Sequence, residues 1–268
     1  MSKAYIIDSL RTPIGKYGGS LSTVRPDDLL ALTIKALVHR NENIDVQAIE
    51  DVIAGCANQA GEDNRDVARM ASLLAGLPIT VGGNTVNRLC ASGLQAIMDA
   101  GRTIMCGDAE LMIAAGVESM TRAPFVMGKS DAPFSRKNEF FDTTLGWRFI
   151  NPLLAKMYHP YSMGETAENV ATQWEVSRHD QDVFAYESQL KYENAHNQQR
   201  FADELIPVEV DLGKGKKLMF EKDEHPRLTS IEKLGELKPV FAKEGTVTAA
   251  NASGINDGAA AMLLASEA

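Results

Sequence analysis

The first 120 residues alternate short apolar segments with helical segments, and this alternation restricts the fold more than any other feature. Strands are expected at 4–7, 51–54, 84–86 and 111–115, and helices at 27–40, 65–75 and 90–106. The continuous apolar runs at 4–7 and 111–115 are typical of buried strands. A further buried strand is expected at 259–265. The order β-α-β-α-β-α-β-β predicts an α/β fold, in which a mainly parallel mixed sheet carries helices on both faces.

The pattern changes after residue 120. Residues 120–161 contain four prolines and several phenylalanines and show no regular period. Helices are expected at 165–175 and at 177–196, where Ser177 is a suitable N-cap, and a strand is expected at 204–210. We therefore expect an inserted α+β loop domain at 120–245, and a core made of 1–119 and 246–268.

The helix expected at 90–106 is apolar around most of its circumference, including Leu94, Met98 and Met105. A helix of this kind is usually buried on more than one side. One sheet covers only one side. We expect another domain or another subunit to cover the rest, and the isolated chain to associate.

Charge and length exclude several classes of protein. The chain has 27 Lys and Arg against 36 Asp and Glu, a net charge of −9, which disfavours nucleic acid as a partner. No apolar run approaches the ~18 residues of a membrane span, and the N-terminus does not resemble a signal peptide. We therefore expect a cytoplasmic protein without a membrane partner. The three cysteines and scattered histidines do not have the spacing of a metal site.

Cys90 is the candidate nucleophile. It follows a short expected strand and opens an expected helix, where the helix dipole and free N–H groups favour the thiolate. The alternative is that Cys90 is a small buried apolar residue. Cys56 and Cys106 are expected to be packing residues. A nucleophilic cysteine needs a base, and the expected α/β core contains only His39, at the end of an exposed helix.

Six segments, spaced along the whole chain, resemble the thiolase family. Together the matches are specific, although any one of them alone is weak. They are RTP at 11–13, NRLCASG at 87–93, GVESM at 116–120, MGETAEN at 163–169, SR with QD at 177–182, and GTVTAANASGINDGAAA at 245–261.

The resemblance implies an acyltransferase that cleaves a 3-oxoacyl-CoA with CoA or condenses two acyl-CoA molecules. Cys90 would accept the acyl group, and residues 120–245 would cover the CoA. No cofactor would be bound permanently, since CoA and acyl-CoA are substrates. The family also implies a homo-oligomer, a dimer or a tetramer. The CoA contacts implied by position are Met163, Arg227, Ser253, Leu154 and Phe241. For Arg227 the alternative is a solvated surface residue.

Two departures refine this expectation. Ser162 stands where acetoacetyl-CoA thiolases tend to have His, and GWRFINP at 146–152 resembles the 3-oxoadipyl-CoA branch.

The resemblance covers the N-terminal two thirds of the family's length. The Asn-Glu-Ala-Phe and Gly-His-Pro segments and the second catalytic cysteine of the C-terminal half do not occur in the 268 residues. We therefore expect weak turnover by this chain alone, and an acyl-CoA-binding module without catalysis is the alternative.

Overall fold

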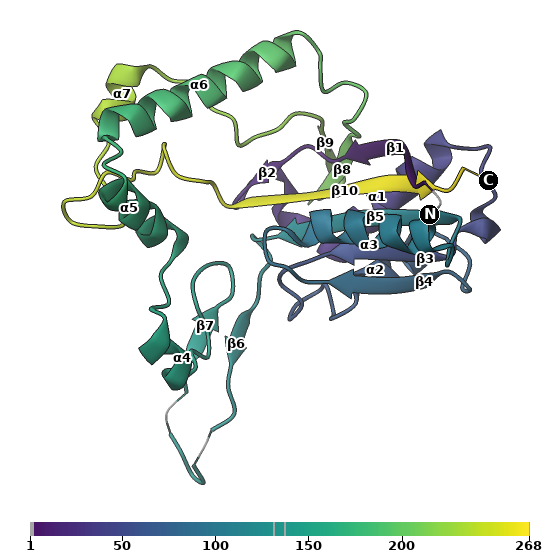
Figure 1. Ribbon diagram of the computed structural model, residues 1–268, viewed down its shortest axis with the longest axis horizontal. Helices are drawn as coiled ribbons and strands as arrows, with labels where there is room; N and C mark the ends of the chain where they lie inside the picture. Colours follow the sequence, from purple (N-terminus) through teal and green to yellow (C-terminus); the bar gives the residue numbers. More distant parts are fainter. Residues whose placement is uncertain (1–2, 131, 137, 268) are drawn as a thin grey trace. The chain divides into compact units, whose positions relative to one another are not determined.

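A computed structural model describes residues 3–130, 132–136 and 138–267. The chain divides into two compact units (Figure 1). Unit 1 contains 1–123, 202–224 and 256–268, and unit 2 contains 124–201 and 225–255. The chain passes between the units four times. No helix among the described residues is long and apolar enough to cross a membrane.

Unit 1 is built on a mixed sheet. Its path runs β1 (Tyr5–Arg11), β10 (Asn256–Ala265), β5 (Leu111–Ser119), β3 (Asp51–Gly55) and β4 (Gly82–Val86). β3 is parallel to both β4 and β5. β10 is antiparallel to both β5 and β1, so four of these five strands run in the same direction. The predicted sheet is confirmed. β10, the last strand in the chain, lies inside the sheet, between β1 and β5.

Helices cover both faces of this sheet, as predicted. One face carries α1 (Pro26–Arg40) and α2 (Val67–Leu74), and the other carries α3 (Ser92–Cys106). β5 alternates between the two cores: Ile113 faces the α1 and α2 side, and Met112 faces the α3 side. Alternation is the rule for a strand, and burial on both faces explains why the run 111–115 in β5 is apolar throughout.

The expectation of a buried strand at 4–7 is wrong. The structure places β1 at the edge of the sheet, where Tyr5, Ile6 and Ile7 are exposed. The reason is that β1 pairs with β10 on one side and makes an isolated bridge on the other only at Arg11, with Leu205, among the described residues. The helices lie mainly over the inner strands. An apolar run alone does not distinguish an edge strand from a central one.

The outer side of α3 is exposed in the chain. Ala96, Ala100 and Ile104 are buried against the sheet, whereas Leu94 and Met98 are exposed. The sequence predicted that this helix needs a second cover. Among the described residues of unit 1, the sheet covers one side of α3, and the side that carries Leu94 and Met98 stays exposed.

A hairpin of β8 (Val208–Gly213) and β9 (Lys216–Phe220) belongs to unit 1. The expected insertion at 120–245 includes this segment, so the compact units differ from the expected boundaries. The hairpin packs with unit 1 because long-range polar contacts hold the residues on both sides of it. Arg11 pairs with Asp223 and Glu204 at 2.8 and 2.7 Å.

Both ends of the segment 225–255 are fixed on one short strand of unit 1. The backbone of Glu224 donates to the Ile14 carbonyl, and the Glu224 carboxylate accepts from the backbone N–H of Lys16 at 3.1 Å. Asn256, at the other end, pairs with Lys16 across β10 and β2 (Gly15–Lys16).

Unit 2 contains two longer helices and several short elements. Ser162 forms a capping box with Glu165 at the start of α5 (Met163–Gln173). Ser177 caps α6 (Arg178–Asn197), as predicted. The short elements of unit 2 are α4 (Pro152–Met157), α7 (Ile231–Gly235), β6 (Phe125–Met127) and β7 (Phe140–Asp142), and those of unit 1 are the 3-10 turns Ser20–Thr23 and Val46–Ala48.

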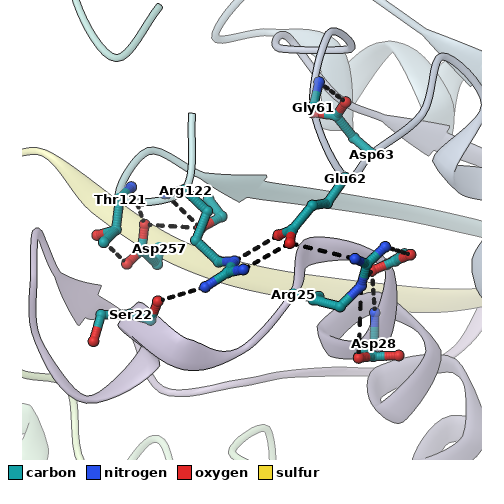
Figure 2. A network of polar contacts seen from close by, with 11 residues as sticks. Ser22, Arg25, Asp28, Gly61, Glu62, Asp63, Thr121, Arg122 and Asp257 are labelled. Carbon is teal, nitrogen blue, oxygen red and sulfur yellow. Dashed lines mark hydrogen bonds and ion pairs between the residues drawn. The ribbon is translucent and has the colours of Figure 1, made fainter. Parts of the chain in front are cut away.

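A polar network fixes the end of β5 in unit 1 (Figure 2). Glu62 accepts two hydrogen bonds from the guanidinium of Arg122, at 2.5 and 2.6 Å, and is also paired with Arg25 at 3.3 Å. Asp257 accepts from the backbone N–H and the hydroxyl of Thr121, at 2.9 and 2.6 Å. The network therefore joins the loop after β3, the residues after β5 and the start of β10.

We expect Glu62→Gln to lower the free energy of unfolding at pH 7 by roughly 0.5–2 kcal/mol. The hydrogen bonds from Arg122 outweigh partial burial and lower the pKa of Glu62. A lowered pKa means that the stabilisation is present above the unfolded-state pKa and is lost as the pH falls through the folded-state pKa. The difference between wild type and variant should shrink in urea unfolding curves taken below pH ~4. Glu221→Gln, at an exposed glutamate, is the control, and a difference that is independent of pH would contradict the assignment.

Candidate active site

Cys90 lies in a tight turn between β4 and α3, and it is exposed. The helix begins at Ser92, two residues later than expected, with Ala91 as its N-cap. The thiol is therefore next to the first turn of α3, where backbone N–H groups lack helical partners. This position agrees with the prediction that Cys90 stands where a helix starts.

The turn before Cys90 has an unusual backbone. Leu89 has a φ of +51°, a conformation that bulky residues rarely adopt. Hydrogen bonds hold it on both sides. Its N–H donates to Asn87 Oδ1 at 2.9 Å, and its carbonyl accepts from Ser92 Oγ at 2.6 Å. The sequence pattern did not indicate this conformation, because leucine carries no turn signal.

Glycines bring the start of α3 close to the sheet. A Cβ on Gly55 would lie 2.3 Å from the carbonyl carbon of Ser92 and 2.4 Å from the nitrogen of Gly93. A Cβ on Gly116, in the neighbouring strand, would lie 3.6 Å from Gly93 Cα. The approach at Gly55 permits only glycine, whereas the distance at Gly116 is an ordinary van der Waals contact. β3 and β5, the strands that carry these two glycines, thus set how closely the start of α3 approaches the sheet just after Cys90.

The loop after β3 lies beside this turn. The partly buried carboxylate of Glu118 accepts hydrogen bonds from the backbone N–H groups of Ala57 and Asn58, at 2.8 and 3.0 Å. Burial raises the pKa of Glu118, and these two hydrogen bonds oppose the rise. Glu118 is part of a segment that supports the family resemblance, but the sequence did not assign it a role.

The other two cysteines differ from Cys90. Cys56 is buried, its thiol donates to the Asn58 carbonyl, and burial raises its pKa, so the predicted packing role is confirmed. Cys106 is exposed at the last residue of α3, so the prediction of a packing role is wrong. It lies on the uncovered side of that helix.

No hydrogen bond to the Cys90 thiol occurs among the described residues of the chain. His39, the histidine of unit 1, is exposed and lies 3.2 Å from Glu42. The sequence offers no obvious base for Cys90 within the core, and this stays a prediction. The other histidines are in unit 2.

The five expected CoA contacts all lie in unit 2. Met163 is exposed at the first residue of α5, and its neighbour Gly164 packs against the ring of Phe241. Ser253 is exposed, and the next residue, Gly254, packs against the ring of His225, two residues before Arg227.

These contacts bring Met163 near Phe241, and Ser253 near the segment that carries Arg227. The backbone of Arg227 donates to Gln189 Oε1 at 2.7 Å. Leu154 is half exposed on a different helix, α4.

The loop at 245–251 is held by polar groups of two helices. Glu168 of α5 accepts from the backbone N–H groups of Thr246 and Val247, at 2.9 and 2.8 Å. Asp182 of α6 is buried and accepts from the side chain of Asn251 at 2.9 Å. The segment leading to Ser253 thus has a fixed backbone.

An α/β unit that presents an exposed cysteine next to a helix start is typical of enzymes that use a thiol nucleophile. The sequence family described as "Thiolase, N-terminal domain" matches residues 4–268. The chain therefore belongs to the thiolase family, whose members are acyltransferases.

Similar proteins agree with this assignment. The 3-oxoadipyl-CoA/3-oxo-5,6-dehydrosuberyl-CoA thiolase of Escherichia coli is 56% identical over all 268 residues, which correspond to 67% of that protein. The beta-ketoadipyl-CoA thiolase of Pseudomonas aeruginosa is 57% identical over 265 residues, 98% of this chain and 66% of that one. The chain thus spans about two thirds of the length of these curated relatives.

The fold has also been observed by crystallography. The crystal structure of the Bacillus anthracis acetyl-CoA acetyltransferase superposes with a TM-score of 0.90 at 38% identity. The match covers all of this chain and 66% of that one. The predicted fold class is thereby confirmed.

We expect Gly55→Ala to displace the start of α3, because the added Cβ would overlap the backbone of Ser92 and Gly93. The free energy of unfolding should fall by about 1–3 kcal/mol in urea titrations. Gly101→Ala is the matched control within α3, where no atom lies within 4 Å of the added Cβ. That variant should be neutral or more stable by up to about 1 kcal/mol. Equal effects of both variants would show that the contact is not tight.

We expect Glu168→Gln to loosen the loop at 245–247. Partial burial of Glu168 favours the neutral form, but the N–H groups of Thr246 and Val247 outweigh it and lower the pKa of Glu168. A glutamine keeps the Oε1 acceptor of both N–H groups, but it loses the negative charge and puts an N–H donor where Oε2 accepts from the N–H and the hydroxyl of Thr246. Hydrogen exchange at Thr246 and Val247 should reveal a protection lower by about 1 kcal/mol. The exposed Glu244 of the same loop, changed to Gln, should leave exchange unaltered, and identical protection in both variants would refute the role of Glu168.

Proposed function

We propose that the chain acts in CoA-dependent cleavage of a 3-oxoacyl-CoA, with Cys90 as the nucleophile that forms the acyl-enzyme. The observation that carries this proposal is the exposed thiol of Cys90 beside the start of α3. A thiol at that position benefits from the dipole and free N–H groups of the helix when it carries negative charge.

The chemistry follows from a thiolate and a 3-oxoacyl thioester. The Cys90 thiolate adds to the 3-oxo carbon, and the bond between C2 and C3 then breaks. The electrons of that bond pass to C2, which takes a proton and leaves as acetyl-CoA. The shortened acyl group stays on Cys90 until the thiol of a second CoA takes it by thioester exchange.

A 3-oxoadipyl group is the proposed acyl chain. Relatives named beta-ketoadipyl-CoA thiolase are 55–57% identical to this chain, and Ser162 stands at the position that the acetoacetyl enzymes tend to fill with His. Cleavage of 3-oxoadipyl-CoA would leave a succinyl group on Cys90.

Unit 2 is proposed to hold the CoA. Met163 and Phe241 offer an apolar surface suited to pantetheine, and the Arg227 side chain offers a fixed positive charge to a phosphate. Ser253 extends from the loop that Glu168 and Asp182 hold, and Leu154 is assigned to the same role with less support from its position on α4.

The test is mass spectrometry of the intact chain after mixing with 3-oxoadipyl-CoA or acetoacetyl-CoA. We expect one succinyl group in the first case, one acetyl group in the second, and a faster reaction in the first. Peptide mapping should place both on Cys90. Cys90→Ala should abolish the adduct, and Cys106→Ala, which removes the other exposed thiol, should preserve it. An adduct that persists in Cys90→Ala would overturn the proposal.

A second candidate function is acyl-CoA binding without catalysis. It is favoured by the absence of a hydrogen-bonded base at Cys90 among the described residues, since general base catalysis contributes ~10²–10⁴-fold. Protection of Cys90 from alkylation by CoA, without any adduct from either thioester, would support this reading over the first.

A further inference from the structure

We propose that Glu118 and Asn87 are positioning residues for Cys90, acting through a relay of hydrogen bonds that ends at the strained residue before the thiol. This inference rests on the proposed function of Cys90 as the nucleophile. Neither residue has a role assigned by sequence or by similarity. The relay runs from the buried end of β5, through the loop after β3, to the turn before α3.

The first step of the relay is a two-point contact. Each carboxylate oxygen of Glu118 accepts one backbone N–H, Oε2 from Ala57 and Oε1 from Asn58. Glu118 lies in β5, where its backbone is paired with Gly258 of β10. Its carboxylate is partly buried, and the two N–H donors offset the cost of removing that charge from water. The loop at 57–58 is therefore fixed to the sheet.

The far part of the same loop is fixed too. Glu62 is held by Arg122 and Arg25, and Arg122 follows Glu118 by four residues in the chain (Figure 2). The segment that leaves β5 thus fixes the loop at two places. The carbonyl of Ala57, between Glu118 and the active-site turn, has a defined position.

The second step joins this loop to the turn. Asn87 Nδ2 donates to the Ala57 carbonyl at 2.9 Å, and Asn87 Oδ1 accepts from the backbone N–H of Leu89 at 2.9 Å. The Asn87 amide therefore donates a hydrogen bond to the loop after β3 and accepts one from the turn before α3. An aspartate could not donate, and an alanine could make neither contact.

The third step is the strained residue. Leu89 has a φ of +51° and is 71% exposed, so burial of its side chain does not explain its conformation. Such strained residues persist where their surroundings impose them, and they cluster at functional sites. The hydrogen bond from Leu89 to Asn87 and the bond from Ser92 to the Leu89 carbonyl impose it here.

The consequence concerns the position of one sulfur atom. Without the contact to Asn87, the backbone at Leu89 can relax toward a common conformation, and Cys90 then moves away from the start of α3. Small displacements of a reacting group lower rates strongly. Glu118 is effective because it sets the position of Ala57, and Asn87 because it transmits that position to Leu89.

The test uses the three cysteines of one chain. Iodoacetamide alkylation, followed by peptide mass spectrometry, gives separate rates for exposed Cys90, exposed Cys106 and buried Cys56. Cys106 lies at the other end of α3 and serves as the internal reference. Cys56, whose thiol donates to the Asn58 carbonyl, reports loosening of the loop that Glu118 holds, and circular dichroism reports loss of the fold. Because iodoacetamide needs no CoA site, this readout stays valid even if no thioester acylates the chain.

We expect Glu118→Gln and Asn87→Ala each to lower the ratio of the Cys90 rate to the Cys106 rate, on the order of tenfold. The double variant should be no worse than either single variant, because the two residues act in one relay. The controls are Glu110→Gln, at an exposed glutamate just before β5, and Asn84→Ala, at an exposed asparagine of β4. Both should keep the wild-type ratio.

Unchanged ratios, or losses that multiply in the double variant, would overturn the relay. If circular dichroism showed that Glu118→Gln is unfolded, Asn87→Ala, at an exposed position, would decide alone. Acylation by 3-oxoadipyl-CoA gives the second readout. The maximal rate of acylation should fall in both variants, and the concentration for half-maximal rate should stay at the wild-type value. A change in half-saturation alone would assign these residues to binding and refute the positioning role.

Discussion

The close approach of a helix start to the centre of a sheet is the contact on which unit 1 depends. The carbonyl carbon of Ser92 and the nitrogen of Gly93 lie where a side chain on Gly55 would be. Because Gly55 has no side chain, α3 can begin directly above β3 and β5. The position of the helix start in turn sets the position of the residues just before it. Cys90, the strained Leu89 and the contact to Asn87 all lie within the five residues that precede α3.

The sequence predicted the order of the core elements well, for physical reasons that can be identified. α1 has Pro26 at its first turn, α3 ends at Gly107 in the left-handed conformation, and α6 begins after the cap Ser177. These are local signals, and local signals can be read from a few residues. The residues that carry the family resemblance were equally visible, because they are contiguous.

What could not be predicted depends on contacts between distant segments. Whether the run at 4–7 lies at an edge depends on which strand pairs with it, and that strand comes some 250 residues later in the chain. The assignment of the β8 and β9 hairpin to unit 1 depends on Arg11 meeting Asp223 and Glu204. The role of Glu118 needs the backbone of Ala57 and Asn58 beside it, and no pattern in the sequence indicates that.

The place of β10 in the sheet has a consequence for how the chain folds during synthesis. β10 lies between β1 and β5, so residues 5–10 of the first strand have no strand partner until residues 256–265 have left the ribosome. The segment 225–255 must be made before that happens, and its two ends are brought together on β2 only when β10 pairs. The entropy of closing that long loop is therefore lost late, in the same step that completes the sheet. Until then the largely apolar inner strands β3 and β5 can pair only with each other and with β4, and the nascent chain presents an open edge that other chains could occupy.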